Sequence, residues 1–230
     1  MKAQRLRVTF TRGDELKYIT HLDLMRMWER ALRRAEIPLA YSEGFSPHPQ
    51  IALAAPLPVG VTSEAELMDV FLEEVMQPRA FAERVAPQLP PSVQIVRVAE
   101  AGLTLPSLQA EVRAAAYDVE VEEASEEEAR RAAEAFLAKE SVSWEHKRED
   151  ETRTYDIRTL VHDITVAALE NGAVRLHMLL RCDSSGSGRP EQVTAALGLP
   201  APRRIHRTRL LLASGSAARA AWRKRGRFSE

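Results

Sequence analysis

The sequence has only one cysteine, Cys182, among its 230 residues. A single cysteine cannot form an internal disulfide, and this one has no Cys or His neighbour at a metal-ligand spacing, which is typical of the reducing cytoplasm. The sequence also lacks the cysteine triplet of a radical-SAM cluster, a nucleophile elbow and any zinc-binding spacing. These absences argue against a self-contained enzyme of those kinds, and we expect neither a metal nor a cofactor.

Long apolar runs are absent as well. The opening residues MKAQRLRVTF hold no apolar run of signal-peptide length, and no later run approaches the roughly 20 apolar residues of a membrane span. We therefore expect a soluble, cytoplasmic protein with no membrane partner. Hydrophobic residues make up 45% of the chain, which is enough to build a buried core in one large domain or two small ones.

The formal net charge of −1 conceals a separation of charge along the chain. Residues 203–227 include nine Arg or Lys and no Asp or Glu, whereas residues 111–151 are rich in glutamate. A basic segment balanced by an acidic one is compatible with a polyanionic partner such as RNA, despite the nearly neutral total.

Hydrophobic periodicity predicts a strand, a helix, two strands, a helix and a strand in the first half of the chain. Leu6, Val8 and Phe10 alternate with polar residues, as in a strand with one buried face. Thr20 followed by Asp23 resembles a capping box that opens a helix. The expected elements are a strand at 6–10, a helix at 21–35, strands at 50–55 and 64–73, a helix from 78 to about 89 and a strand at 93–98.

The same order of elements is expected again after a linker at 102–107. Ser125 and Glu128 form a capping box, and Asn171 with Gly172 predicts a hairpin turn. Extended segments are expected at 112–121, 142–147, 154–169, 173–180 and 204–213, with helices at 125–137 and after 190. The sequence thus predicts an α+β protein with two tandem ferredoxin-like (βαββαβ) units and antiparallel sheets, at 1–103 and 108–213, and a basic, flexible tail at 214–230.

Arginines gather on the predicted first helix and again near the end of the chain. The planar guanidinium group suits phosphate because it donates two hydrogen bonds in a fixed geometry. Each arginine taken alone fits a solvated helix face with ion pairs to Glu29 or Glu36, whereas the group favours a phosphate-bearing partner. The candidate phosphate-binding residues are Arg26, Arg30, Arg33, Arg34, Arg204 and Arg207.

The loop at 41–49, YSEGFSPHP, offers hydroxyls, two aromatic rings and an imidazole between two prolines. Tyr41, Ser42, Phe45 and His48 are candidate contacts to an RNA base. The alternative is a rigid structural turn whose aromatic rings cover the core. Both interpretations, the base-binding loop and the structural turn, stay open. Replacement of His48 would distinguish them best.

Two histidines are candidate general bases, His48 and His21. His21 and Asp23 at the helix start could join His48 in binding a metal or moving a proton, but no third ligand is placed by spacing, and a capping role for Asp23 is favoured. A later loop of small residues at 183–190 leads into a helix and could receive a phosphate, although it matches no phosphate-loop pattern and also reads as a flexible connection.

The segment THLDLMRMWERALRRAEIPLAYSEGFSPHPQIALAAPLPVG, residues 20–60, resembles a bacterial radical-SAM-associated domain family of unknown function. Shorter pieces at 155–158, 189–190 and 205–208 extend the resemblance to about residue 213. In that family the domain occurs alone or fused C-terminal to a cobalamin-type radical-SAM protein. The resemblance implies a helper in a modification reaction, with a radical-SAM enzyme as partner and RNA as a substrate class.

These observations lead to an accessory RNA-binding or substrate-presenting module that acts with a separate radical-SAM enzyme and is not catalytic on its own. One alternative is a metal-independent ribonuclease, because tandem ferredoxin-like proteins of bacterial CRISPR systems share the expected architecture. The other is a domain that only binds proteins, through the apolar residues of the 41–49 loop. The sequence does not disclose the oligomeric state.

Overall fold

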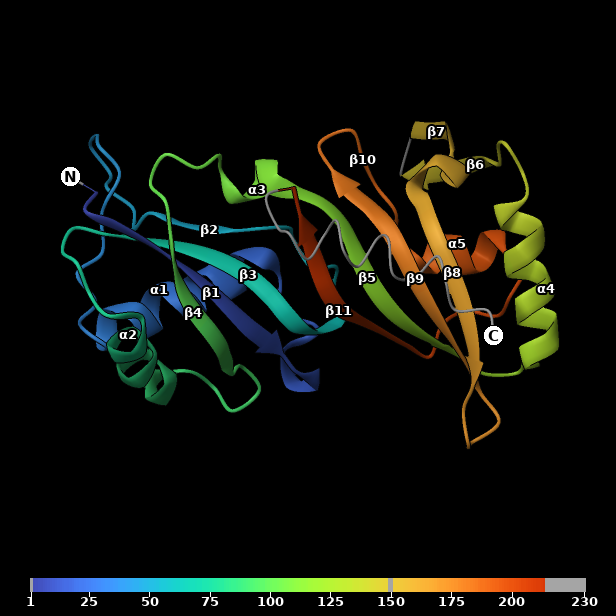
Figure 1. Cartoon of the computed structure of the whole chain (residues 1–230), viewed down its shortest axis with the longest axis horizontal. Coiled ribbons are helices and arrows are strands. Elements are labelled where there is room, and N and C mark those ends of the chain that lie inside the picture. The colour runs from blue at the N-terminus through green and yellow to red at the C-terminus, as the bar shows by residue number, and fades with distance from the viewer. Residues whose placement is uncertain (1, 149–150, 214–230) are drawn as a thin grey trace. The chain divides into compact units, whose positions relative to one another are not determined.

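The computed structural model describes residues 2–148 and 151–213, and the tail predicted at 214–230 lies outside them. The chain divides into two compact units, Met1–Val112 (unit 1) and Arg113–Glu230 (unit 2). Each unit combines a mostly antiparallel sheet with a few helices, which confirms the predicted α+β class (Figure 1). None of the described helices has both the length and the apolar character needed to cross a membrane.

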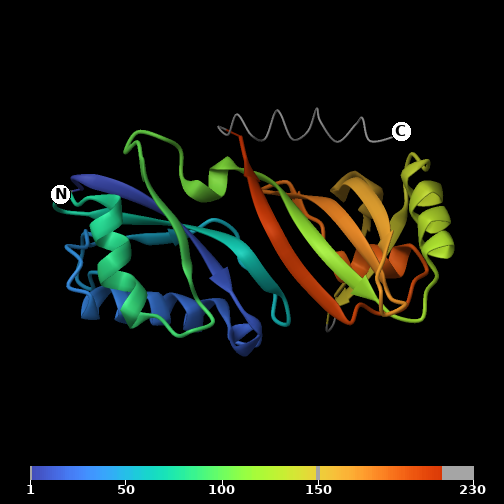
Figure 2. The ribbon, with the colours of Figure 1, turned by 60° about the horizontal axis from the view of Figure 1, so that its bottom comes forward.

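Unit 1 has a four-stranded sheet with its two longer helices on one face. The sheet order is β4-β1-β3-β2, and neighbouring strands are antiparallel. In the view of Figure 2, α1 runs below this sheet. The elements are β1 (Gln4–Arg12), η1 (Asp14–Leu16), α1 (His21–Arg34), β2 (Ile51–Leu53), β3 (Thr62–Leu72), α2 (Pro78–Val85), η2 (Ala86–Gln88), β4 (Ile95–Ala101) and α3 (Leu108–Glu111).

The core of unit 1 lies between the sheet and α1. Leu6, Val8 and Phe10 are fully buried in one cluster with Trp28 and Leu32 of the helix. The rings of Phe10 and Trp28 meet edge to face with their centroids 4.9 Å apart, an arrangement that aromatic pairs favour. The alternation of apolar residues in the sequence therefore identifies the helix-facing side of β1 correctly.

The first helix begins and ends close to where its sequence predicts. The hydroxyl of Thr20 accepts a hydrogen bond from the backbone N–H of Asp23 at 3.2 Å and donates one to its carboxylate at 2.7 Å. These bonds satisfy one free N–H group of the first turn. The hydrogen bond from Thr20 is the main cause that lowers the pKa of Asp23, so this carboxylate serves as part of the cap.

Unit 2 repeats the strand order of unit 1 when the two-residue strand β10, which also pairs with β9, is set aside. Its sheet runs β11-β5-β9-β8, in which β9 is antiparallel to both β5 and β8. The β8–β9 turn contains Asn171 and Gly172, the hairpin signal of the sequence, and Gly172 has a φ of +80° that suits glycine. The elements are β5 (Val112–Val121), α4 (Glu126–Leu137), β6 (Ser143–Arg148), β7 (Glu151–Asp156), η3 (Ile157–Leu160), β8 (Val161–Ala168), β9 (Val174–Asp183), β10 (Gly186–Ser187), α5 (Pro190–Ala196) and β11 (Arg204–Leu212).

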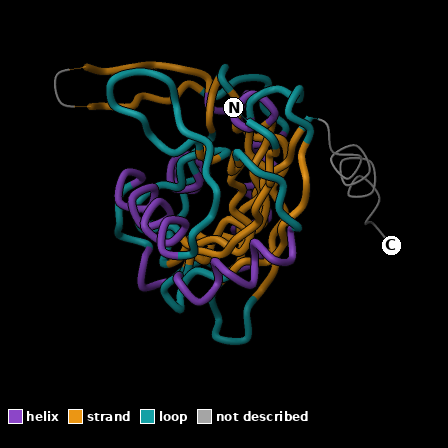
Figure 3. The backbone as a smooth tube through the Cα atoms, turned by 90° about the vertical axis from the view of Figure 1, so that its left-hand side faces the viewer, coloured by secondary structure: helices purple, strands orange, loops and turns teal. Residues whose placement is uncertain are grey.

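Strands β6 and β7 form a separate two-stranded sheet, which Figure 3 shows as a hairpin that extends from the rest of the unit. The sequence predicts a single extended segment at 154–169, and this prediction is wrong. The chain turns at η3 because the carboxylate of Asp156 accepts backbone hydrogen bonds from Val142 at 2.8 Å and from Arg158 at 3.0 Å. These bonds end β7 before β8 begins.

Candidate functional site

The face of the unit 1 sheet that points away from α1 carries charged and aromatic side chains. Arg5 alternates with Leu6 on β1, and Phe71 lies between the core residues Val70 and Leu72 on β3. Because successive side chains of a strand point to opposite faces, Arg5 and Phe71 share the face opposite α1. The two residues are also paired in the register of β1 with β3.

A buried charge network occupies the middle of this face. Asp69 accepts hydrogen bonds from Arg5 Nε at 2.8 Å and from Arg7 Nε at 2.9 Å, and Arg7 also donates to Glu111 at 2.8 Å. The side chains of Arg5, Asp69 and Glu111 are no more than 3% exposed. The alternating pattern of β1 places these arginines on its solvent side, but the structure buries Arg5 because the chain after β4 passes over it.

The segment that follows β4 is held to this face by the same arginine. The guanidinium group of Arg5 donates to the backbone carbonyls of Leu105 at 3.0 Å and Pro106 at 2.9 Å. Two cations and two carboxylates therefore neutralise each other, and only Arg7, 16% exposed, reaches the surface. Mutual neutralisation is the condition under which buried charges are tolerated. We assign Arg5 and Arg7 a structural role.

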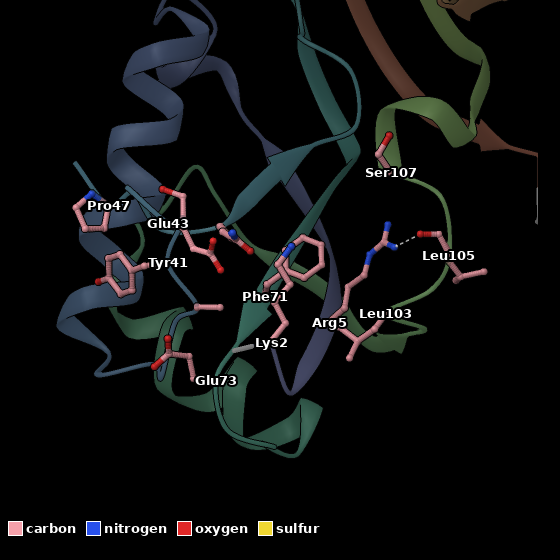
Figure 4. A pocket seen from close by; sticks show the side chains of 13 residues that line it. Lys2, Arg5, Tyr41, Glu43, Pro47, Phe71, Glu73, Leu103, Leu105 and Ser107 are labelled. Atoms are coloured by element: carbon pink, nitrogen blue, oxygen red, sulfur yellow. Dashed lines mark hydrogen bonds between the residues drawn. The ribbon is translucent and has the colours of Figure 1, made fainter. Parts of the chain in front are cut away.

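An open groove of about 1140 Å³ lies beside this network (Figure 4). Figure 4 shows Tyr41 and Pro47 on one side, Leu103 and Leu105 on the other, and Phe71 between them. The ammonium group of Lys2 lies 4.4 Å from the centroid of the Phe71 ring, within the range of a cation–π contact. The groove is lined by Lys2, Arg5, Ala40, Tyr41, Ser42, Glu43, Pro47, Gln50, Phe71, Glu73, Leu103, Leu105 and Ser107.

The predicted loop forms one wall of the groove. Tyr41 pairs with Pro49 across the loop. Two hydrogen bonds between Ser42 and His48 fix the shape of the loop. The backbone N–H of Ser42 donates to the carbonyl of His48 at 2.9 Å, and the backbone N–H of His48 donates to the hydroxyl of Ser42 at 3.0 Å. Gly44 has a φ of +118°, which an L side chain rarely adopts. Phe45 is fully exposed, so the interpretation in which this ring covers the core is wrong.

Of the loop candidates, Tyr41 and Ser42 line the groove, whereas Phe45 and His48 do not. His21 does not line it either. No group of three or more His, Cys, Asp or Glu side chains suited to a metal occurs within residues 2–148 and 151–213. The groove itself thus presents rings, hydroxyls and charges, with no imidazole.

The helix arginines lie on a different surface. Arg26, Arg30 and Arg33 are exposed on α1, and Arg34 donates to the backbone carbonyl of Gln88 at 2.9 Å. Since α1 covers the opposite face of the sheet, these arginines and the groove are separated by the sheet. Their proximity in the sequence suggests that the first helix and the 41–49 loop form one surface. In the structure, the helix arginines and the groove lie on opposite sides of the sheet.

The two candidates near the end of the chain belong to unit 2. Arg204 is exposed and lies 3.9 Å from Glu120, a distance that allows only a weak surface ion pair. Arg207 is 1% exposed, so it does not belong to an exposed cationic face. Its neighbours Arg204 and Arg209 on β11 are exposed, so the density of arginine in the segment does not reveal which guanidinium group is buried.

Sequence reasoning misses most residues of the groove outside the 41–49 loop, among them Lys2, Phe71 and Glu73. Phe71 stands in an apolar run and is interpreted as core, although it lies on the open face. The period-two pattern of β3 carries the signal, because Phe71 is out of phase with Met68, Val70 and Leu72.

No curated protein matches this chain. Among solved structures, it is similar to a chain of a Cbf5-Nop10-Gar1 complex, with a TM-score of 0.47 and 10% identity over 91% of this chain and 49% of the other. It is also similar to a chain of an H/ACA RNP bound to a substrate RNA containing 2'-deoxyuridine, with a TM-score of 0.43 and 12% identity over 88% and 47%. The chain thus spans about half the length of these relatives, and at such scores the likeness decides neither fold nor function.

The family comparison covers most of the chain. The model described as "Uncharacterized protein conserved in bacteria (DUF2344)" matches residues 5–190, which include the 41–49 loop and every lining residue of the unit 1 groove except Lys2. The chain therefore belongs to this bacterial family of uncharacterised proteins.

Proposed function

We propose that unit 1 binds single-stranded RNA through the groove of Figure 4, as a non-catalytic accessory module in the cytoplasm. The observation that carries this proposal is that Tyr41, Phe71 and the ammonium group of Lys2 line one open groove. Aromatic faces accept any nucleobase by stacking, and a nearby cation attracts the backbone phosphate.

The sheet topology supports this assignment. We infer that the regions 1–103 and 108–213 are tandem ferredoxin-like units, because each sheet has the order fourth, first, third and second strand when the β6–β7 hairpin and β10 are set aside. An open sheet face on a four-stranded unit of this kind is a surface on which RNA-binding modules stack bases. Fold alone does not establish function, so the groove residues carry the proposal.

The acidic residues of the groove indicate which part of the RNA it would take. Glu43 and Glu73 line it together with Lys2, so the groove is not uniformly cationic. A phosphate would be repelled by these carboxylates, whereas the amino groups of a base would donate hydrogen bonds to them. We therefore infer that the groove takes a base between its walls, and that a phosphate contacts it only at the exposed Lys2.

The resemblance of residues 20–60 to a radical-SAM-associated family supports a further part of the proposal. The module would present RNA to a separate radical-SAM enzyme that supplies the chemistry. This role requires the RNA to remain intact on the protein, and prolonged incubation of RNA with the purified chain followed by gel electrophoresis checks that requirement.

Fluorescence anisotropy with a short labelled single-stranded RNA tests the groove. Loss of one stacked base costs about 1–3 kcal/mol, so Tyr41→Ala should weaken binding by about 5- to 150-fold. Binding should also weaken as salt rises, because phosphate contacts release counterions.

Tyr18→Ala provides the matched control. Tyr18 is 71% exposed and has the ammonium of Lys17 5.3 Å from its ring centroid, yet it does not line the groove. RNA affinity that is absent at low salt, or that falls equally in Tyr18→Ala and Tyr41→Ala, would contradict the proposal.

One observation favours a second function. Phe45 is fully exposed at the tip of a loop whose shape is fixed by hydrogen bonds, and such a ring suits docking onto another protein. Pull-down of a candidate radical-SAM enzyme separates the two functions. A protein interface should be lost in Phe45→Ala and retained in the double variant Arg33→Ala and Arg34→Ala.

A further inference from the structure

A second pocket, of about 600 Å³, lies within unit 2 between the β6–β7 hairpin and the loop that leads from β9 to α5. The hairpin contributes His146, Arg153 and Tyr155, and the loop contributes Ser187 and Arg189. His146 and Arg153 are directly opposite in the hairpin register, and Tyr155 lies two residues further along β7. All three side chains therefore share one face of the hairpin.

A chain of hydrogen bonds fixes the imidazole in this pocket. The hydroxyl of Tyr155 lies 2.6 Å from the carboxamide oxygen of Gln192, and the carboxamide nitrogen lies 3.2 Å from Nδ1 of His146. With its oxygen engaged by the tyrosine, the carboxamide donates to Nδ1, so the neutral imidazole carries its proton on Nε2. His146 thus has one N–H group left to donate to a ligand.

The loop that forms the other wall is built tightly. A Cβ atom on Gly188 would lie 2.9 Å from the carbonyl oxygen of Leu160, and one on Gly186 would lie 2.8 Å from the side chain of the same leucine. The carboxylate of Asp183 accepts from the backbone N–H of Ser185 at 2.8 Å. The small residues of this loop therefore allow it to pack closely against Leu160.

The charges around the pocket favour an anion. Arg153 and Arg189 bring guanidinium groups from the two walls. Asp156 is the one carboxylate that lines the pocket within the described residues, and its oxygen already accepts from the backbone N–H groups of Val142 and Arg158. Burial, and then the charge of the neighbouring Glu191, raise the pKa of the Tyr155 hydroxyl, so a second carboxylate acts close to the pocket and is outweighed by Arg153, Arg189 and the imidazole N–H. Guanidinium groups, an imidazole N–H and serine hydroxyls are the donors that hold phosphate in proteins.

We propose that this pocket binds the phosphate group of a nucleotide, with Arg153 and Arg189 on the phosphate and His146 donating from Nε2. A volume of about 600 Å³ exceeds what inorganic phosphate needs and falls in the range of pockets that enclose a small organic ligand. Tyr155 and Gln192 are positioning residues, because they act through His146. The nucleotide is either free or the phosphorylated end of an RNA strand, and both present the same phosphate monoester.

Calorimetric titration with AMP, adenosine and inorganic phosphate tests the phosphate requirement, using the full chain with Tyr41→Ala so that the contribution of the unit 1 groove is reduced. AMP should bind at least about tenfold more tightly than adenosine, because adenosine lacks the phosphate and cannot form the hydrogen bonds to the charged groups of the pocket. RNA decamers with a 5′-phosphate, a 3′-phosphate or no phosphate then separate the two sources. Tighter binding of one phosphorylated decamer than of AMP identifies an RNA end, and equal binding of all three decamers identifies a free nucleotide.

The double variant Arg153→Ala and Arg189→Ala should weaken AMP binding at least about tenfold. Arg130→Ala with Arg131→Ala is the matched control, since it removes the same charge from exposed ion pairs on α4. Arg153→Lys with Arg189→Lys keeps the charge and removes the bidentate fork, so its affinity should be intermediate, and circular dichroism verifies that each variant is folded. The ¹⁵N spectrum of His146 should change in Gln192→Leu, which a purely structural glutamine would not cause.

Three results would overturn the proposal. The first is that neither AMP nor any phosphorylated decamer binds at up to about 1 mM. The second is that adenosine binds as tightly as AMP. The third is that the pocket variant and the α4 control variant lose the same affinity. AMP and adenosine differ only in the phosphate, and every titration uses the same Tyr41→Ala background, so the comparison between these two ligands does not depend on whether the unit 1 groove binds RNA.

Discussion

Replacing Asp69 with asparagine tests whether the buried charge network stabilises unit 1. The carboxylate is 1% exposed and accepts from Arg5 Nε at 2.8 Å and from Arg7 Nε at 2.9 Å. Asparagine keeps the shape of the side chain but removes its charge. Arg7 then keeps one carboxylate within hydrogen-bond distance, that of Glu111, whereas Arg5 keeps no carboxylate among the described residues. Breaking a buried pair in this way costs about 3–5 kcal/mol.

Urea unfolding followed by the fluorescence of Trp28 measures this cost in unit 1. The sequence has three tryptophans, and replacing the other two, Trp144 and Trp222, with phenylalanine leaves the buried Trp28 as the reporter. With an m-value of about 2 kcal/mol/M, the midpoint of unfolding should fall by roughly 1.5–2.5 M.

The control is the same chemical change at an exposed pair. Glu83 accepts from Arg79 at 2.7 Å, and the two side chains are 62% and 89% exposed. Glu83→Gln should cost less than about 1 kcal/mol, because water screens an exposed pair. If Asp69→Asn costs no more than Glu83→Gln, the network is not a source of stability and the reasoning is refuted.

Three further predictions concern stability. Backbone hydrogen bonds lower the pKa of Asp156 below its ordinary 3.8. The ionised carboxylate therefore stabilises the folded protein at neutral pH, and this contribution is lost as pH falls through the lowered pKa. Asp156→Asn should therefore be less stable than the parent protein near neutral pH. The urea midpoints of the variant and of the parent should converge as pH falls below about 3.8. Gly188→Ala should lose about 1–3 kcal/mol in thermal or urea unfolding because the new Cβ meets Leu160 at 2.9 Å, whereas Gly102→Ala, whose nearest contact is 3.4 Å, should stay within about 0.5 kcal/mol. Phe45→Ser should also leave the free energy of unfolding within about 0.5 kcal/mol, since the ring is fully exposed, and a larger loss would show that it packs against the protein.

Local signals in the sequence predict the ends of elements well. Thr20 caps α1, Ser125 caps α4 through the N–H of Glu128 at 3.2 Å, and Pro190 opens α5, each as the residue types indicate. Capping depends on residues three positions apart, so a single sequence contains all the information it needs. The break between β7 and β8 is missed because Asp156 accepts from Val142, which lies in another part of the chain.

Contacts between distant segments account for what the sequence does not reveal. Nothing in the pattern of β1 distinguishes a solvated arginine from Arg5, whose partners at Asp69 and Leu105 come from later segments. The same holds for both pockets, because His146 meets Gln192 only through the placement of the β6–β7 hairpin. The predicted roles of the α1 arginines and of His48 stay predictions, since no contact in the structure tests them.

The hydrogen bond between Arg7 and Glu111 also has a consequence for the order of events during synthesis of the chain. The two residues are separated by 104 positions, so the second residue emerges from the ribosome long after β1 has been made. Until then the guanidinium group of Arg7 has only Asp69 to neutralise it, and the segment that carries Glu111 cannot cover this face of the sheet. We expect a chain truncated before Glu111 to remain sensitive to proteases. A chain long enough to include Glu111 should become protease-resistant in a single step.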